Sequence, residues 1–244
     1  ARDAVLALAP GQVLGIGTGS TANWFIDVLA PHKAHFSGVV SSSVASTQRL
    51  LKHGFYVIDA NQVETLPAYV DGADEIDPSG HMIKGGGGAL LQEKIVATAS
   101  DQMIVIADVG KEVERLGAFP LPIEVIPFGW QTTKTLVEEM LISLDVLGRD
   151  VTLRMNGDRP FITDEGNHIL DLHLNRIGNA RQMAMVLNQV PGVVENGLFI
   201  DICDIVVVGY GDGRVEVRDI NQGTVEKDRL DFTESDNLFS DLME

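Results

Sequence analysis

The stretch YVDGADEIDPSGHMIKGGGGALLQEK, residues 69–94, holds an unusual concentration of polar groups behind an apolar strand. Its carboxylates are Asp71, Asp74, Glu75, Asp77 and Glu93, and its lysines are Lys84 and Lys94. Lys84 stands directly before four glycines, and Glu93 lies on the helix that residues 89–99 predict. Carboxylates at a strand end can move protons, and the N–H groups of a glycine run at a helix start can hold an oxyanion. The stretch therefore predicts a catalytic centre.

The position of Glu93 on this helix supports the same interpretation. At 100° per residue, Leu91, Ile95 and Thr98 share one face, whereas Glu93 lies on another, beside two alanines (Ala89 and Ala97). Small neighbours would let a ligand reach the carboxylate. Taken alone, Glu93 would be a solvated glutamate on an exposed face, and only the adjacent acidic and glycine loops favour a role in the site.

The chain upstream reads as the first half of a βαβ unit, with a strand at 13–16, a loop at 17–21 and a helix at 22–29. A dinucleotide fingerprint is not complete, because Ser20 stands at the third glycine position and the next strand (36–40) ends in serines. No lysine precedes Ser20, which excludes a Walker loop. We expect a small-phosphate cradle formed by Thr18, Gly19, Ser20 and Thr21. The alternative is an ordinary turn with Ser20 or Thr21 as N-cap.

Further apolar strands are expected at residues 68–70, 103–107, 204–209 and 214–218, and a helix at 48–53, capped by Ser46 or Thr47. Lys111 follows one of these strands, at the carboxyl end where open α/β sheets bind ligands. We expect an α/β protein whose Rossmann-like, mostly parallel sheet comprises residues 1–122 and 197–219.

Residues 123–196 predict a different unit. Their order is strand, helix, strand, strand, helix, strand, which is that of a ferredoxin-like α+β layer, with the last strand at 193–199. We expect this unit to be inserted into the main sheet as a lid domain. From residue 220 the chain is acidic and lacks periodicity, which indicates a mobile or partner-binding tail over 220–244.

The composition limits the partners. Eighteen basic and 35 acidic residues give a formal charge of −17, which would repel nucleic acid and anionic membranes. No stretch approaches the roughly 20 apolar residues of a membrane span, and we expect a cytoplasmic protein with a small-molecule substrate. The single cysteine, Cys203, allows no internal disulfide. No histidine pair has zinc spacing, and the acidic loop lacks the register of a calcium loop, so no metal or other cofactor is predicted.

Three motifs in this order, GIGTGSTA (15–22), DGADEID (71–77) and KGGGGALLQEK (84–94), resemble type A ribose-5-phosphate isomerase. The motifs SSSVAST (41–47), IADVGK (106–111) and FPLPIEV (119–125) follow the same family order. The resemblance implies the metal-free interconversion of ribose 5-phosphate and ribulose 5-phosphate in the pentose phosphate pathway. It also implies a Rossmann-like domain with an α+β lid, and association as a homodimer or homotetramer.

By this resemblance Glu93 matches the catalytic base, and Asp71, Asp74 and Lys84 match a polar ring around the sugar. The loop Thr18 to Thr21 and Lys111 match substrate-binding groups. From the chemistry, we expect Lys84 and the N–H groups of Gly85, Gly86 and Gly87 to hold the oxyanion. Asp71 or Asp74 would serve ring opening. The chain departs from the family pattern at Gly88, commonly alanine, and Gly110, commonly serine.

Two other classes of function stay open at this point. A non-catalytic sugar-phosphate sensor would carry this type of domain, although no basic segment here offers the usual DNA-binding helices. A related isomerase or amino-sugar deaminase is the second alternative. A deaminase would need a histidine for ring opening, and His81 is the one that the site segments provide.

Overall fold

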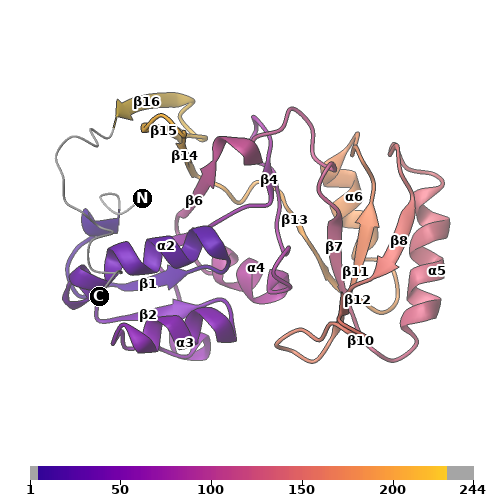
Figure 1. Cartoon of the computed structure of the whole chain (residues 1–244), viewed down its shortest axis with the longest axis horizontal. Coiled ribbons are helices and arrows are strands. Elements are labelled where there is room, and N and C mark those ends of the chain that lie inside the picture. Colours follow the sequence, from indigo (N-terminus) through magenta and orange to yellow (C-terminus); the bar gives the residue numbers. More distant parts are fainter. Residues whose placement is uncertain (1–4, 230–244) are drawn as a thin grey trace.

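The computed structural model describes residues 5–229 and shows a seven-stranded sheet in the order β16-β15-β14-β6-β3-β1-β2 (Figure 1). Its five parallel strands are β1 (Val13–Ile16), β2 (Gly38–Ser41), β3 (Tyr69–Asp71), β6 (Met103–Asp108) and β14 (Ile205–Gly209). The predicted α/β fold with a mostly parallel sheet is confirmed.

Helices cover both faces of this sheet, as a parallel sheet requires. They are α2 (Ser20–Leu29), α3 (Val44–Lys52) and α4 (Leu90–Thr98), with 3-10 turns at Ala30–His35, Ala60–Gln62 and Val109–Lys111. Val70 packs with α2 and α3, whereas its neighbour Tyr69 packs with α4, because successive strand residues face opposite sides. Among the described residues, none of the helices is both long and apolar enough to cross a membrane.

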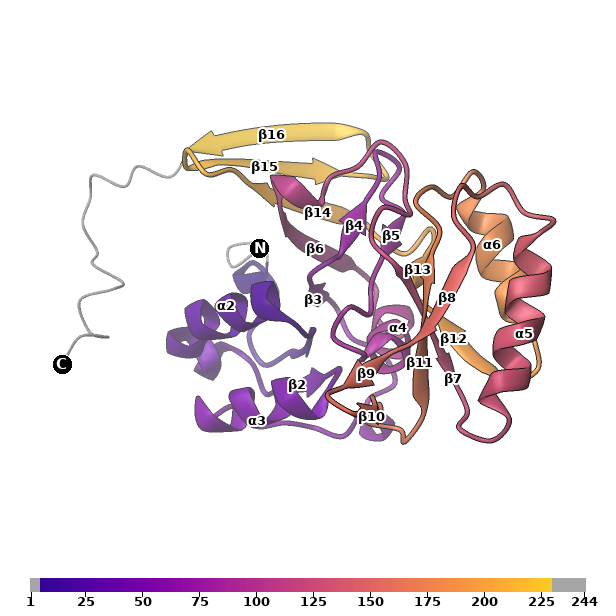
Figure 2. The same ribbon diagram turned by 45° about the vertical axis from the view of Figure 1, so that its right-hand side comes forward.

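The second layer consists of two helices and a four-stranded antiparallel sheet in the order β12-β7-β11-β8. Its elements are β7 (Leu121–Val125), α5 (Trp130–Leu141), β8 (Asp150–Leu153), β11 (His168–His173), α6 (Ala180–Leu187) and β12 (Val193–Asn196). Both helices contribute to one apolar core on this sheet, for example through Leu141 and Leu187. The predicted element order is confirmed. A short hairpin, β9 (Met155–Asn156) and β10 (Arg159–Pro160), reaches from this layer towards the larger sheet (Figure 2).

A small sheet joins the two layers: β4 (Glu75–Ile76), β5 (Met82–Ile83) and β13 (Leu198–Phe199). The single strand predicted at 193–199 is therefore wrong, because Gly197 separates β12 from β13. A Cβ at Gly197 would lie 2.3 Å from the carbonyl oxygen of Lys84. Since Ile83 and Leu116 also belong to the core of the second layer, the division at 122/123 and 196/197 stays a proposal.

The prediction of a mobile tail is wrong for residues 224–229, which form a strand, whereas a partner-binding role stays a prediction. β15 (Arg214–Asp219) pairs antiparallel with β16 (Thr224–Arg229), which forms the sheet edge. All six residues of β16 are exposed, so neither face needs apolar side chains and the strand carries no alternating pattern. Residues 230–244 lie outside the described residues.

Buried Glu75 fixes the junction, because its carboxylate accepts hydrogen bonds from the N–H groups of Gly117 (2.7 Å) and Phe119 (2.5 Å). Glu75→Ala leaves both donors without a partner, and we expect it to lower the free energy of unfolding by about 2–4 kcal/mol. Urea denaturation measures this change. Exposed Glu64 provides the control: Glu64→Ala should stay within about 0.5 kcal/mol of the wild type. Equal effects of the two substitutions would contradict the role of Glu75 as the acceptor that holds the junction.

Candidate active site

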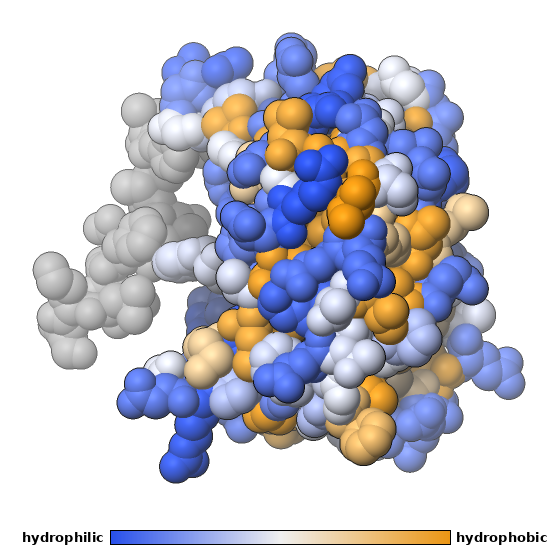
Figure 3. Space-filling view, turned by 90° about the vertical axis from the view of Figure 1, so that its right-hand side faces the viewer, coloured by the Kyte–Doolittle hydropathy of each residue, from blue (hydrophilic) through white to orange (hydrophobic). Residues whose placement is uncertain are grey.

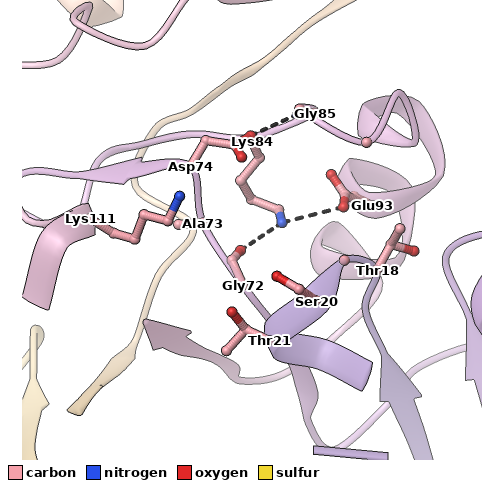
Figure 4. A pocket seen from close by; sticks show the side chains of 13 residues that line it. Thr18, Ser20, Thr21, Gly72, Ala73, Asp74, Lys84, Gly85, Glu93 and Lys111 are labelled. Atoms are coloured by element: carbon pink, nitrogen blue, oxygen red, sulfur yellow. Dashed lines mark hydrogen bonds and ion pairs between the residues drawn. The ribbon is translucent and has the colours of Figure 1, made fainter. Parts of the chain in front are cut away.

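A cavity opens at the carboxyl ends of the parallel strands (Figure 4). Every site residue predicted from the sequence lines it, with the exception of Asp71. The lining residues are Thr18, Gly19, Ser20, Thr21, Gly72, Ala73, Asp74, Lys84, Gly85, Gly86, Gly87, Glu93 and Lys111. Glu93 and the loop at residues 18–21 therefore share one cavity, although they come from different motifs.

The loop before α2 presents unsatisfied N–H groups. Gly19 is the N-cap residue, with a φ of 107°, and no side chain of the described residues caps this helix. The alternative in which Ser20 or Thr21 is the N-cap is wrong. Because the first N–H groups of a helix have no partner within it, this end of α2 can bind an anion such as a phosphate.

The serine motif supports this loop from behind. The hydroxyl of Thr18 donates to Ser43 (2.7 Å), and the hydroxyl of Ser46 donates to the carbonyl oxygen of Gly17 (2.8 Å). Ser43 is also the N-cap of α3, accepting from the N–H of Ser46. The predicted cap at Ser46 or Thr47 is wrong because the helix begins four residues earlier, at Val44, than the sequence indicates.

Asp71 is fully buried behind the cavity wall. Its carboxylate accepts hydrogen bonds from the N–H groups of Thr18 (3.0 Å) and Gly72 (2.7 Å), and from the Tyr69 hydroxyl. A Cβ at Gly17 would lie 2.0 Å from the Asp71 carboxyl carbon, so only glycine lets the two segments approach. Tyr69 was missed in the sequence, although it stands two positions before Asp71 on one strand and thus on the same face.

Lys84 connects the carboxylates. Its ammonium group lies 2.8 Å from Oδ2 of Asp71 and 3.5 Å from Oε1 of Glu93, and it donates to the carbonyl oxygen of Gly72 (2.7 Å) (Figure 4). Burial alone would lower its pKa, but the charges of Asp71 and Glu93 reverse this effect and raise the pKa. Lys84 is therefore a buried cation.

Glu93 is 4% exposed and lies on the buried face of α4, together with Leu90, Val96 and Ala97. The apolar face suggested by the sequence is the outer one, since Ile95 is 54% exposed. Among the described residues, no group hydrogen-bonds to Oε2 of Glu93. Burial raises the pKa of Glu93 to about 8, against the opposing charge of Lys84. A buried carboxylate with an open oxygen and a raised pKa is suited to proton transfer.

Asp74 contacts the glycine loop directly. The N–H of Gly86 donates to Oδ2 of Asp74 (2.7 Å), so this N–H, which we expected at the oxyanion, is already used. Gly85 and Gly88 have φ values of 99° and 80°, which side chains rarely adopt. A Cβ at Gly88 would also lie 2.4 Å from the ring of Phe161. At Gly88, where the family commonly has alanine, the ring of Phe161 therefore occupies the position that an alanine side chain would need.

Other polar residues of the opening stretch lie outside the cavity. Asp77 accepts from the N–H groups of Ser79 and His81 in a turn, and the ring of His81 contacts Asp77 and Asp201. His81 therefore does not occupy the position that a deaminase would need. Among residues 5–229, no group of three or more His, Cys, Asp and Glu side chains could hold a metal ion. The absence of a cofactor stays a prediction.

The sequence of this chain is similar to those of known proteins. The model of the family "Ribose 5-phosphate isomerase A (phosphoriboisomerase A)" matches residues 38–213. A protein named ribose-5-phosphate isomerase A from Ruegeria pomeroyi is 66% identical, over 99% of this chain and 94% of its own length. This chain belongs to the ribose 5-phosphate isomerase A family. A second relative, from Roseobacter denitrificans, is 59% identical over the same shares of both chains.

Solved structures of ribose 5-phosphate isomerases have the same fold. The enzyme from Neisseria gonorrhoeae has a TM-score of 0.78 and 38% identity, over 88% of this chain and 92% of that one. A D-ribose-5-phosphate isomerase in complex with phospho-erythronic acid has a TM-score of 0.78 and 36% identity, over 94% and 95% of the two chains. The sequence resemblance to the family is thus confirmed.

The buried carboxylate should make stability depend on pH. The pKa of Glu93 rises from its ordinary value of 4.5 to about 8 in the folded protein, so the folded state binds this proton more tightly than the unfolded state. The wild type then loses stability as the pH rises from about 4.5 to about 8. Glu93→Gln carries no ionisable group, and we expect it to raise the unfolding temperature relative to the wild type at pH 9 but little at pH 5.

Thermal unfolding at the two pH values measures this difference. Each kcal/mol should shift the unfolding temperature by about 2–4 °C in a chain of this size. Glu64→Gln, at an exposed position, is the matched control, for which no such pH-dependent gain is expected. A gain for Glu93→Gln that is the same at both pH values would contradict the prediction.

Proposed function

We propose that Glu93 is the proton shuttle with which this chain interconverts D-ribose 5-phosphate and D-ribulose 5-phosphate through an enediolate. The observation that carries this proposal is the open Oε2 atom of a buried glutamate, in the same cavity as an uncapped helix N-terminus. The reaction requires a carboxylate that takes a proton from carbon and a group of N–H donors that binds the phosphate.

In the proposed step, Glu93 removes the proton from C2 of the open-chain aldose. The C–H electron pair forms the C1–C2 double bond, and the carbonyl electron pair moves to O1, giving an enediolate. Collapse of the O2 oxygen to a ketone then returns an electron pair to C1, which takes the proton back from Glu93. Because C1 and C2 are adjacent, one carboxylate reaches both carbons. The transfer between the oxygens, from O2 to O1, completes the proton balance.

Lys84 and the glycine loop would stabilise the enediolate charge. Lys84 lies within 3.5 Å of Glu93 and has a raised pKa, so it brings a fixed positive charge next to the reacting carbons. The N–H of Gly87 would add a hydrogen bond, whereas that of Gly86 is committed to Asp74. Preorganised hydrogen-bond donors stabilise a developing negative charge most strongly where water is excluded.

The remaining residues would position the sugar. The N–H groups and hydroxyls of residues 18–21, with Lys111, would bind the phosphate, whose binding energy holds C1 and C2 at Glu93. Ring opening needs an acid–base group that touches the sugar. Asp74 lines the cavity and Asp71 does not, so we assign this role to Asp74 and the holding of Lys84 to Asp71.

We further propose a cytoplasmic homodimer or homotetramer that works in the pentose phosphate pathway, with the second layer as a lid. The high negative charge favours solubility. The outer face of the second layer mixes apolar with hydrophilic residues (Figure 3), and Ile142 and Met185 are 70% and 65% exposed. Such side chains could contribute to a subunit interface. Light scattering, which gives the mass in solution, distinguishes both assemblies from a monomer.

The proposed shuttle predicts separate effects on turnover and binding. Glu93→Gln keeps the shape of the side chain but cannot accept the carbon-bound proton. We expect turnover of ribose 5-phosphate, assayed without added metal by the ketose signal, to fall by at least about 10³-fold. Calorimetry should show nearly unchanged binding of ribose 5-phosphate. Turnover near the wild-type level would remove Glu93 from the mechanism, and a wild-type enzyme that binds without turnover would favour a sensor.

The raised pKa also predicts the dependence of the rate on pH. A base must be deprotonated to act, so kcat/KM should rise about tenfold per pH unit at low pH and level off above about 8, the pKa of Glu93. The midpoint belongs to the coupled pair of Glu93 and Lys84. Initial rates from pH 5 to 10 measure it. Glu93→Asp should retain slow turnover with a displaced midpoint, whereas a flat wild-type profile would contradict the assignment.

A further inference from the structure

Arg154, which lies between β8 and β9 in the second layer, contacts the glycine loop of the active site. One nitrogen of its guanidinium group, Nη1, donates to the carbonyl oxygens of Gly85 and Gly86, both at 3.0 Å. About 70 residues separate the two segments in the chain. The second layer thus supplies a cation to the backbone of the loop that lines the cavity.

The other side of the guanidinium group is fixed as well. Nε donates to Oδ2 of Asp171 (2.9 Å), and Nη2 donates to Oδ1, which makes a bidentate pair. The ring of Phe161 lies 5.9 Å below the guanidinium carbon, and the Phe161 N–H donates to the carbonyl oxygen of Arg154. Because a planar fork held on one edge can aim its remaining donors in one direction only, Arg154 is oriented towards the loop.

The peptide unit between Gly85 and Gly86 is held at both ends. Its carbonyl oxygen accepts from Arg154, and its N–H donates to Asp74 (2.7 Å). No cis peptide bond occurs in the described residues, so C=O and N–H point in opposite directions in each unit. Arg154 therefore lies opposite Asp74 across this peptide.

The same geometry applies to the next peptide unit. The carbonyl oxygen of Gly86 points at Arg154, so the N–H of Gly87 points away from Arg154. Glycines at these positions have many accessible conformations, and an unfixed peptide could rotate this N–H out of place. Gly87 lines the cavity.

We propose that Arg154 is a positioning residue for the isomerase reaction: by binding the carbonyl oxygens of Gly85 and Gly86, it aims the N–H of Gly87 at the developing oxyanion and that of Gly86 at Asp74. Arg154 does not touch the substrate. Its effect reaches the transition state through the two peptide units. This inference rests on the proposed role of the glycine loop, but not on the identity of the proton shuttle.

The test uses steady-state kinetics of the full chain. Because the N–H of Gly87 matters most when charge develops on the substrate oxygen, Arg154→Ala should lower kcat about 10- to 100-fold and change KM less than about threefold. Guanidinium ion at millimolar concentration, far below denaturing levels, should restore part of kcat by filling the vacated space. Arg159→Ala is the matched control, an exposed arginine of β10, and should keep wild-type kinetics with and without guanidinium.

A second variant distinguishes the proposed effect from a general loss of folding. Asp171→Asn leaves Arg154 in the chain but weakens the pair that orients it, and should lower kcat by a smaller factor at an unchanged KM. Wild-type kcat in Arg154→Ala, or a loss that guanidinium does not restore while Asp171→Asn stays fully active, would overturn the inference. If Glu93→Gln remained active, the proposed shuttle would fail separately, because that substitution leaves the contacts of Arg154 intact.

Discussion

The ion pair between Asp71 and Lys84 is the interaction on which this site depends. The two charges are almost inaccessible to solvent, with side-chain exposures of 0% and 3%. Asp71 connects its own strand to two other segments, because it binds the N–H of Thr18 and the ammonium group of Lys84 in addition to the hydroxyl of Tyr69. Removing either charge would leave the other buried and unpaired, at a cost of about 3–5 kcal/mol. The pair thus specifies the relative position of the phosphate loop and the glycine loop.

The unequal sharing of Lys84 also decides which carboxylate can act as a base. Lys84 lies 2.8 Å from Asp71 but 3.5 Å from Glu93. Asp71 has its acceptor sites filled by four donors and lies behind the cavity wall. Glu93 is buried to a similar degree but receives less compensation, and the outcome is a pKa of about 8. Burial without full pairing therefore makes this carboxylate basic and leaves one oxygen for the substrate.

The sequence predicts much of this site because parallel strands place their carboxyl ends along one edge of a sheet. Motifs that follow β1, β3 and β6 must then meet there, as residues 18–21, Asp74 and Lys111 do. The sequence could not separate Asp71 from Asp74, which stand in one short loop and differ only in what packs on them. β16 carried no pattern because both of its faces are exposed. The sequence did not indicate the contact of Arg154 with the glycine loop, because its partners in that loop are backbone carbonyl oxygens, which do not depend on side-chain identity.

The site is fixed from the second layer as well as from the main sheet. The chain returns from that layer through Gly197, whose N–H donates to the carbonyl oxygen of Pro122 (2.8 Å) and whose carbonyl oxygen accepts from the N–H of Lys84 (2.9 Å). The backbone of Lys84 is therefore held by the strands that lead into and out of the second layer, while its ammonium group is held by Asp71. The packing at Gly197 leaves no room for a side chain, so this contact cannot loosen by a simple substitution. A shift of the second layer would move Lys84 and Arg154 together, and with them both the cation and the N–H groups that we assign to the enediolate. The arrangement of the two layers is thus part of the catalytic geometry, and a sheet with the same motifs but without the second layer would not hold its oxyanion donors in place.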